Sequence, residues 1–264
     1  MDCNASNAKI GFIGFGNMAS AMADGWIANG AVDGSQMCAC AAHFDALKGK
    51  CAARNMTAMP DAGAVIEASQ VVVIAVKPGM IEDVLNPFTG KLGGKILLSV
   101  AWGWDNAAWD FAFPGSHHIS TVPNTPVSVN EGVIAVEREH TLSAGEHALV
   151  TELLKLLGLA VELPSNALFV GGTVGGCAPA FIAMAIEALG DAAVKHGIPR
   201  KDAYNIVSQM ILGTAKQQLV TGAHPAALKD AVCSPAGATI KGVASLEEDG
   251  FRAALFNAID ATLG

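Results

Sequence analysis

The segment Lys9-Ile10-Gly11-Phe12-Ile13-Gly14-Phe15-Gly16-Asn17-Met18-Ala19 decides the fold of the first half of the chain. Residues 9–13 form a short apolar run typical of a buried strand, and residues 18–30 show helical spacing that ends at a glycine. Between them lies a G-x-G-x-x-A turn. Its first glycine permits a tight strand-to-helix turn, its second lets the backbone approach a pyrophosphate, and Ala19 lets the helix pack on the strand. In this context the turn predicts dinucleotide binding, with a coincidental glycine turn as the alternative.

Further short apolar runs alternate with helical patterns along the first half of the chain, at 36–41, 71–76, 95–100, 118–122 and 133–136. This alternation predicts a parallel sheet with helices on both faces, a doubly wound α/β domain of the Rossmann type. Ligands bind such sheets at the carboxyl ends of the strands, so we expect the turns 14–16, 77–79 and 123–126 to line one crevice. A helix at 144–157 and a strand at 159–163 complete a domain predicted to span residues 1–164.

The strand pattern ends at Pro164, and residues 165–264 are predicted to form an all-helical domain. One helix is expected to begin near Pro179, and another to span 201–220. The faces of these helices are rich in apolar residues, and a helical module of this size is marginal alone. We therefore expect dimerisation through this domain.

A loop of small residues, Ser234-Pro235-Ala236-Gly237-Ala238-Thr239, opens directly onto a helical pattern. Small residues let the backbone come close to a ligand, and the first turn of a helix presents unpaired N–H groups to an anion. Thr239 adds a hydroxyl near the start of that helix. The loop predicts a site for a carboxylate or phosphate, with a simple capped turn as the alternative.

Composition narrows the class of protein. A chain of 264 residues with 52% hydrophobic content suits about two domains with a substantial core. A net charge of −8 without a cluster of Lys or Arg argues against nucleic acid and anionic membrane surfaces as partners. No apolar run approaches the roughly 18 residues of a membrane span, and neither cysteines nor histidines have zinc-ligand spacing. We expect a cytoplasmic protein without a metal site.

Four motifs taken together resemble the pyrroline-5-carboxylate reductases. They are the glycine-rich turn, Ala75-Val76-Lys77-Pro78, Pro123-Asn124-Thr125-Pro126, and the 234–239 loop with Leu246-Glu247 and Gly250-Phe251-Arg252. The resemblance covers nearly the whole chain, and the C-terminal stretch is its most specific part. It implies an NAD(P)H-dependent oxidoreductase that reduces the cyclic imine 1-pyrroline-5-carboxylate to L-proline, the last step of proline biosynthesis.

The resemblance also implies where the ligands bind. The cofactor would contact the turn, the 75–78 segment and the 123–126 turn, through Gly14, Phe15, Gly16, Asn17, Met18, Ala75, Val76, Lys77, Pro78 and Asn124. The substrate carboxylate would be held by the loop of the other subunit of a homodimer or higher oligomer, through Ser234, Gly237, Ala238 and Thr239. Hydride transfer to a C=N bond needs positioning rather than a nucleophile or metal. We predict that the Thr239 hydroxyl lies near the ring nitrogen and assists its protonation.

The end of the second strand bears on the choice of cofactor. It reads Cys40-Ala41-Ala42-His43, without the acidic residue that commonly binds the ribose hydroxyls of NAD. This predicts NADPH, with NADH possible, and places His43 or Lys48 near the 2′-phosphate.

Three departures from the family pattern bear on specificity: Trp102 and Cys177 replace small residues, and Ser120 stands where Arg is common. The alternatives are a reductase of a related cyclic imine, a hydroxyacid dehydrogenase with Lys195 or His196 as base, and a catalytically silent nucleotide-binding paralogue.

Overall fold

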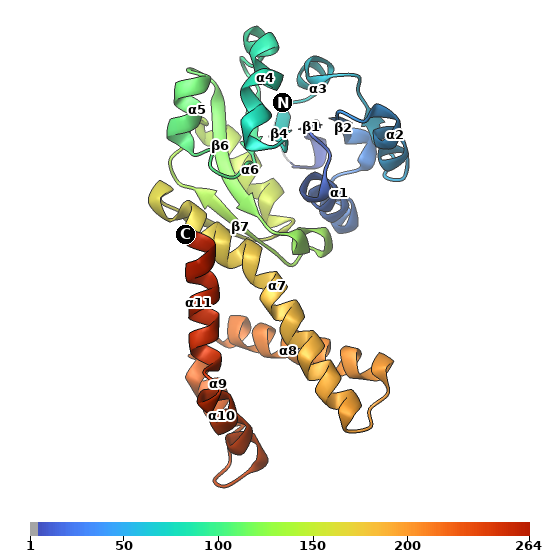
Figure 1. The fold of residues 1–264 in the computed structure, drawn as a ribbon. Helices are drawn as coiled ribbons and strands as arrows, with labels where there is room; N and C mark the ends of the chain where they lie inside the picture. Colours follow the sequence, from blue (N-terminus) through green and yellow to red (C-terminus); the bar gives the residue numbers. More distant parts are fainter. Residues whose placement is uncertain (1–4) are drawn as a thin grey trace. The chain divides into compact units, whose positions relative to one another are not determined.

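The computed structural model describes residues 5–264, which divide into two compact units, one through Gly176 and one from Cys177 to Gly264. The first unit contains an eight-stranded sheet in the order β3-β2-β1-β4-β5-β6-β7-β8 (Figure 1). Its strands are β1 (Ile10–Ile13), β2 (Met37–Cys40), β3 (Thr57–Ala58), β4 (Val71–Ile74), β5 (Ile96–Ser99), β6 (His117–Pro123), β7 (Gly132–Glu137) and β8 (Gly158–Leu163). All but the two-residue β3 follow from the apolar runs of the sequence.

The sheet is mixed rather than wholly parallel. β6 and β7 run antiparallel, with Thr121 opposite Val136 and Pro123 opposite Ile134, whereas every other neighbouring pair is parallel. The link between β6 and β7 holds only the short 3₁₀ segment η5 (Thr125–Val129). A parallel crossover needs a dozen or more connecting residues, so the chain returns in the opposite direction. The expectation of a parallel sheet was wrong at this pair.

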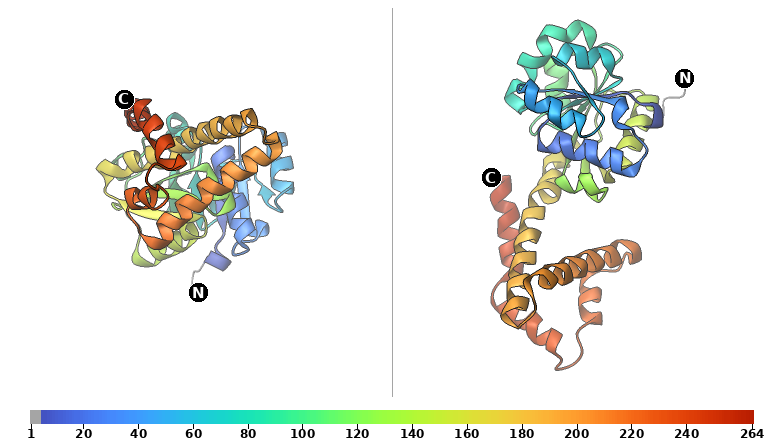
Figure 2. Two further views of the ribbon diagram at one scale, coloured as in Figure 1. Left: turned by 90° about the horizontal axis from the view of Figure 1, so that it is seen from below. Right: turned by 90° about the vertical axis from the view of Figure 1, so that its right-hand side faces the viewer.

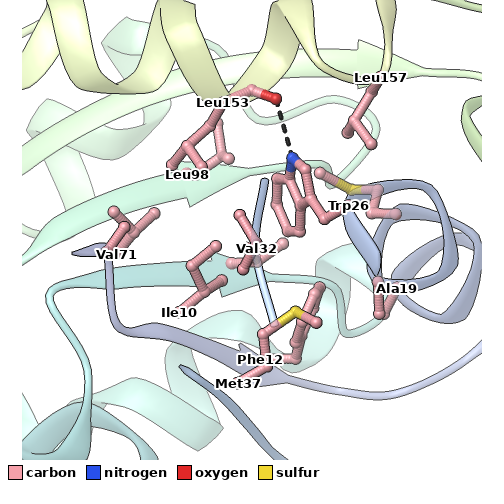
Figure 3. Close-up of a cluster of buried hydrophobic side chains, with 14 of the residues drawn as sticks. Ile10, Phe12, Ala19, Trp26, Val32, Met37, Val71, Leu98, Leu153 and Leu157 are labelled. Atoms are coloured by element: carbon pink, nitrogen blue, oxygen red, sulfur yellow. Dashed lines mark hydrogen bonds between the residues drawn. The ribbon is translucent and has the colours of Figure 1, made fainter. Parts of the chain in front are cut away.

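Helices cover both faces of the sheet, as the doubly wound prediction requires. They are α1 (Asn17–Asn29), α2 (Phe44–Ala52), α3 (Ala62–Ala68), α4 (Ile81–Leu85), α5 (Asn106–Ala112) and α6 (Ala144–Lys155). One apolar core lies between the sheet and α1, α2 and α6, and a second between the sheet and α3, α4 and α5. In the first core, Trp26 is fully buried and its Nε1 donates to the Leu153 carbonyl at 2.8 Å, which joins α1 to α6 (Figure 3).

The helix α7 (Ser165–Lys195) begins fourteen residues before the predicted start near Pro179, so that proline lies inside it. At this start the Ser165 N–H donates to the Glu139 carboxylate at 2.9 Å, and the Ser165 hydroxyl donates to the carboxylates of Glu137 and Glu139 at 2.5 and 2.9 Å. Pro179 has no N–H for the Gly175 carbonyl four residues earlier. That carbonyl accepts from the side-chain amide of Asn124 instead, at 2.8 Å, so the helix continues through the proline.

The second unit consists of helices, which confirms the prediction for this part of the chain. Besides the end of α7 it holds α8 (Arg200–Thr221), α9 (Pro225–Ala231), α10 (Ala238–Glu248) and α11 (Phe251–Leu263). These helices are splayed apart (Figure 2), and α9, α10 and α11 bury no side chain among the described residues. By length and composition α7 alone among the described helices is apolar enough to cross a membrane. Many large apolar side chains of this unit are exposed: Ile182, Met184, Leu189, Met210, Leu219, Val220, Leu246, Phe251 and Phe256.

Candidate active site

The glycine-rich turn has the geometry of a dinucleotide turn. Gly14 has a φ of 89°, and a Cβ there would lie 2.6 Å from the Ala75 carbonyl oxygen, so only glycine fits. A Cβ at Gly16 would meet nothing within 4 Å, so the space beside this residue is open. Gly16 is also the N-cap residue of α1, and having no side chain it offers no acceptor to the first N–H groups of the helix. Within the described chain the first N–H groups of α1 are therefore unpaired and face open space, which fits a pyrophosphate.

Two pockets flank this turn at the carboxyl ends of β1, β2 and β4. The larger, of about 410 Å³, is lined by Gly14, Phe15, Gly16, Ala41, Ala42, His43, Ala46, Leu47, Lys50, Ala75 and Lys77. The smaller, of about 300 Å³, is lined by Ile13, Gly14, Cys40, Ala41, Ala42, Pro60, Asp61, Ala62, Val76, Lys77, Met80 and Val84. Both pockets are lined by Gly14, Ala41, Ala42 and Lys77. The structure thus brings seven of the predicted cofactor residues to one edge of the sheet.

The other predicted cofactor residues line neither pocket. Asn17 and Pro78 are exposed at the starts of α1 and of a 3₁₀ turn, and Met18 packs partly against the core. Asn124 is buried; its side-chain oxygen accepts from Val133 N at 2.9 Å, and its amide donates to Gly175. The 123–126 turn therefore does not share these pockets with the first two turns. A cofactor contact by Asn124 stays a prediction.

The chemistry of the two pockets differs. None of the described residues lining the larger pocket is acidic, and it contains two lysines, Lys50 and Lys77. The smaller pocket contains Asp61, whose carboxylate is already used as a cap, accepting from Ala64 N at 2.9 Å. Burial raises the pKa of the Cys40 thiol in its wall to about 11, so this thiol is neutral at physiological pH. The larger pocket therefore suits an anion better than the smaller one, in which Asp61 adds a negative charge beside Lys77.

The sequence indicated Lys48, beside His43, as a residue that binds the anion, and did not indicate Lys50. In the structure Lys48 forms an ion pair with Asp45 at 3.2 Å and lies over the ring of Phe44. Lys50 lines the pocket instead. Helical spacing was the available signal, because Lys50 lies seven residues after His43 and therefore on the same face of α2.

The 234–239 loop belongs to the second unit and is a tight turn. The Gly237 N–H donates to the Ser234 carbonyl at 3.0 Å, and Ala236 has a φ of 58°, in the left-handed region. A Cβ on Gly237 would lie 2.3 Å from Ser234 Oγ. Gly237 caps α10 without a side-chain bond, and Ala238 and Thr239 are exposed in its first turn. Within the described chain the Thr239 hydroxyl has no hydrogen-bond partner. The loop thus offers free N–H groups and a free hydroxyl.

The described residues contain no group of three or more His, Cys, Asp or Glu side chains that could hold a metal ion. The five described cysteines are free thiols, and Cys3 lies outside the described residues.

Comparison with known proteins places these features in a family. The chain is 41% identical over 261 residues to the pyrroline-5-carboxylate reductase of Treponema pallidum, covering 97% of this chain and 98% of that protein. The chain belongs to the pyrroline-5-carboxylate reductase family. The family model described as pyrroline-5-carboxylate reductase dimerisation matches residues 168–264, and the model described as NADP oxidoreductase coenzyme F420-dependent matches residues 9–103.

Other members of the reductase family are similar to this chain over nearly its whole length. The pyrroline-5-carboxylate reductase of Escherichia coli is 37% identical over 256 residues, covering 95% of this chain and 94% of that protein. A crystal structure of Plasmodium falciparum pyrroline carboxylate reductase with NADP bound superposes with a TM-score of 0.87 at 26% identity. It covers 98% of this chain and 96% of that chain. The dimerisation match includes the 234–239 loop and the exposed apolar helices.

Proposed function

We propose that this protein reduces 1-pyrroline-5-carboxylate to L-proline with NADPH, the last step of proline biosynthesis. The observation that carries the proposal is the 234–239 loop: an uncapped helix start with a free hydroxyl, inside the segment that matches the reductase dimerisation model. The substrate has a carboxylate and an imine nitrogen on one small ring. N–H donors and a hydroxyl within one helical turn are suited to bind both groups.

NADPH supplies the hydride when it is bound. The residues of this chain orient it: the unpaired N–H groups at the start of α1 bind the pyrophosphate, and Gly16 leaves room for its approach. The segment 75–78 lies beside this turn, as the short distance between Gly14 and the Ala75 carbonyl shows. It borders the nicotinamide half of the cofactor.

The 234–239 loop binds the substrate. In this proposal the N–H groups at the start of α10, with Ser234, hold the carboxylate, since a helix N-terminus favours an anion. The Thr239 hydroxyl donates to the neutral ring nitrogen and so assists its protonation. Once this nitrogen carries the proton, the hydroxyl oxygen accepts from its N–H. No nucleophilic side chain would be needed, because bound NADPH would supply the hydride to the imine carbon and the nitrogen would take up a proton.

A second copy of the chain completes the site. The exposed apolar side chains of α7 to α11 can be buried only against another protein surface, and the dimerisation match covers these helices. The loop of one subunit then serves the cofactor bound by the other. Contact with a second subunit also explains why α7 is long and apolar without placing it in a membrane. In this proposal the enzyme is cytoplasmic and binds neither nucleic acid nor lipid.

The role of Thr239 is tested by NADPH consumption with 1-pyrroline-5-carboxylate as substrate. Removing a positioned hydrogen-bond donor costs roughly 10²–10³ in kcat. We expect Thr239→Val to lower kcat to that extent while leaving the Kd for NADPH unchanged, and Thr239→Ser to keep most of the activity. An unchanged kcat/KM in Thr239→Val would remove the hydroxyl from the mechanism. Absence of proline formation by the unaltered protein would overturn the proposed function itself.

A further inference from the structure

One face of the helix α2 is turned toward the larger pocket. His43, which caps α2, lines this pocket together with Ala46, Leu47 and Lys50 of the helix itself. These positions are spaced three, four and seven residues from the first, which is the spacing of one helical face. Residues 14–16 of the glycine-rich turn line the same pocket. A group bound there therefore contacts both this turn and this face of α2.

The charge of Lys50 is not neutralised by a carboxylate. Its Nζ donates to the Phe15 carbonyl at 3.3 Å, and within the described chain it forms no ion pair. The basic residues two positions before it and four after it do have acidic partners. Lys48 pairs with Asp45 at 3.2 Å, and Arg54 binds Asp24 through two bonds of 2.6 and 2.9 Å. Lys50 alone of the three keeps its charge free at the pocket.

The rest of the pocket also favours an anion. The two residues after β2, Ala41 and Ala42, have neither charge nor hydrogen-bonding side chains, and none of the described residues lining the pocket is acidic, so the lining would not repel a phosphate. Lys77 also lines the pocket and adds a second positive charge. The N–H groups of α1 are the donors for the pyrophosphate. Lys50 lies instead on the helix that follows β2, the strand whose end binds the adenosine ribose in folds of this type.

We propose that Lys50 is the residue by which this protein distinguishes NADPH from NADH. Its Nζ exchanges the neutral Phe15 carbonyl for the 2′-phosphate, a charge-assisted contact, whereas Lys48 takes no part. The inference rests on the proposed function in one respect only, that NADPH is the natural reductant.

The test is equilibrium binding without substrate, so its outcome is independent of catalysis. Titrations of NADPH and NADH are compared in the unaltered protein, Lys50→Gln, Lys50→Arg and Lys48→Gln. Hydrogen bonds to charged groups are strong enough that loss of one weakens binding about 10- to 100-fold. We expect Lys50→Gln to raise the Kd for NADPH by that factor and to change the Kd for NADH less than about twofold. Lys50→Arg keeps most of the preference.

Lys48→Gln is the matched control, since it removes the same charge from the same exposed helix. We expect it to leave the preference for NADPH unchanged. If Lys50→Gln weakened the binding of NADPH and NADH equally, Lys50 would only stabilise the turn through Phe15, and the inference would fail. It would also fail if both glutamine variants lost the same affinity, or if the unaltered protein bound the two cofactors equally. Selective loss of NADPH would stand even in a protein that does not reduce 1-pyrroline-5-carboxylate.

Discussion

Gly14 and Gly16 are two residues apart in the turn and have opposite surroundings. Gly14 combines a φ of 89° with a carbonyl oxygen 2.6 Å from its absent Cβ, whereas Gly16 faces open space. The G-x-G-x-x-A pattern identified both glycines, because the reason for glycine at each position lies within the turn itself. It did not identify Lys50, which reaches the same pocket from the end of another helix.

This contrast predicts different effects of alanine at the two positions. Gly14→Ala introduces strain and a clash with backbone, and we expect it to lower the free energy of unfolding by about 1–3 kcal/mol. In Gly16→Ala there is room for the added methyl group, so the free energy of unfolding should change by less than about 0.5 kcal/mol. The Kd for NADPH should rise, because the methyl group occupies the space for the pyrophosphate. Urea denaturation and cofactor titration measure the two effects. Equal destabilisation by both substitutions would contradict this assignment.

The buried His118 predicts a dependence of stability on pH. Its ring is fully buried, with Nδ1 3.0 Å from Ser116 Oγ and Nε2 3.0 Å from Asn106 Oδ1. Burial lowers its pKa below the usual 6.5, against the opposing charge of Asp110. As the pH falls through 6.5 the unfolded chain takes up the proton first. The stability contributed by neutral His118 is therefore present above pH 6.5 and lost as the pH falls toward the folded pKa.

We expect the free energy of unfolding to fall below pH 6.5 by at most about 1.4 kcal/mol per pH unit from this one group. In His118→Gln this part of the slope should disappear, although the variant is less stable at pH 8. His196→Gln, at an exposed histidine, is the control and should keep the slope. A His118→Gln protein with the original pH profile would show that other groups cause it.

At the scale of elements, α7 shows how a distant side chain decides a boundary. Pro179 has the local signature of a helix start, since proline is favoured at the first helical position. The structure instead continues the helix back to Ser165. There Glu139 accepts from the Ser165 N–H, the Ser165 hydroxyl donates to Glu137 and Glu139, and Asn124 donates to the carbonyl that Pro179 leaves free. These partners come from β6, β7 and the segments after them, so no window of sequence around α7 contains them.

This arrangement predicts coupling between Asn124 and Pro179. Asn124→Ala leaves the Gly175 carbonyl and the Val133 N–H without partners, and we expect a loss of about 1–3 kcal/mol in unfolding free energy. In a Pro179→Ala background the residue at 179 can donate to Gly175, so the same substitution should cost less. A double-mutant cycle measured by denaturation gives the coupling. Additive effects within about 0.5 kcal/mol would mean that Asn124 does not compensate for the proline.

The burial of each strand explains how well the sequence predicted its position. β1, β4 and β5 are buried over their whole length and appear as continuous apolar runs, so their positions were predicted to within one or two residues. The two residues of β3 carry no such signal. The direction of β7 depends on the length of the link before it, and the expectation from alternation alone was therefore wrong there.

At the scale of the whole molecule, the helical unit is incomplete alone. Its predicted helical character is confirmed, but the apolar faces of the helices remain exposed in a single chain. The sequence indicated a dimer for the same reason, since too few side chains can be buried within so small a helical module. The arrangement of two copies is not a property of one chain, and the predicted shared site therefore needs a test of its own.

Subunit mixing provides that test. Gly16→Val is expected to block cofactor binding, and Gly237→Val to disrupt the substrate loop, since its side chain would overlap Ser234 Oγ. If the loop of one subunit serves the cofactor of the other, a mixed dimer of the two inactive variants contains one site with both parts intact. Dissociating and reassociating the mixture should then restore part of the activity. No recovery despite formation of mixed dimers would mean that each site lies within one chain.

The most direct measurement is the fate of a labelled hydride. The protein is supplied with NADPH carrying deuterium at the transferable position of the nicotinamide, together with 1-pyrroline-5-carboxylate, and the product is analysed by mass spectrometry and NMR. We predict L-proline with one deuterium on the carbon that belonged to the C=N bond. A protein that binds NADPH but forms no deuterated proline would contradict the account.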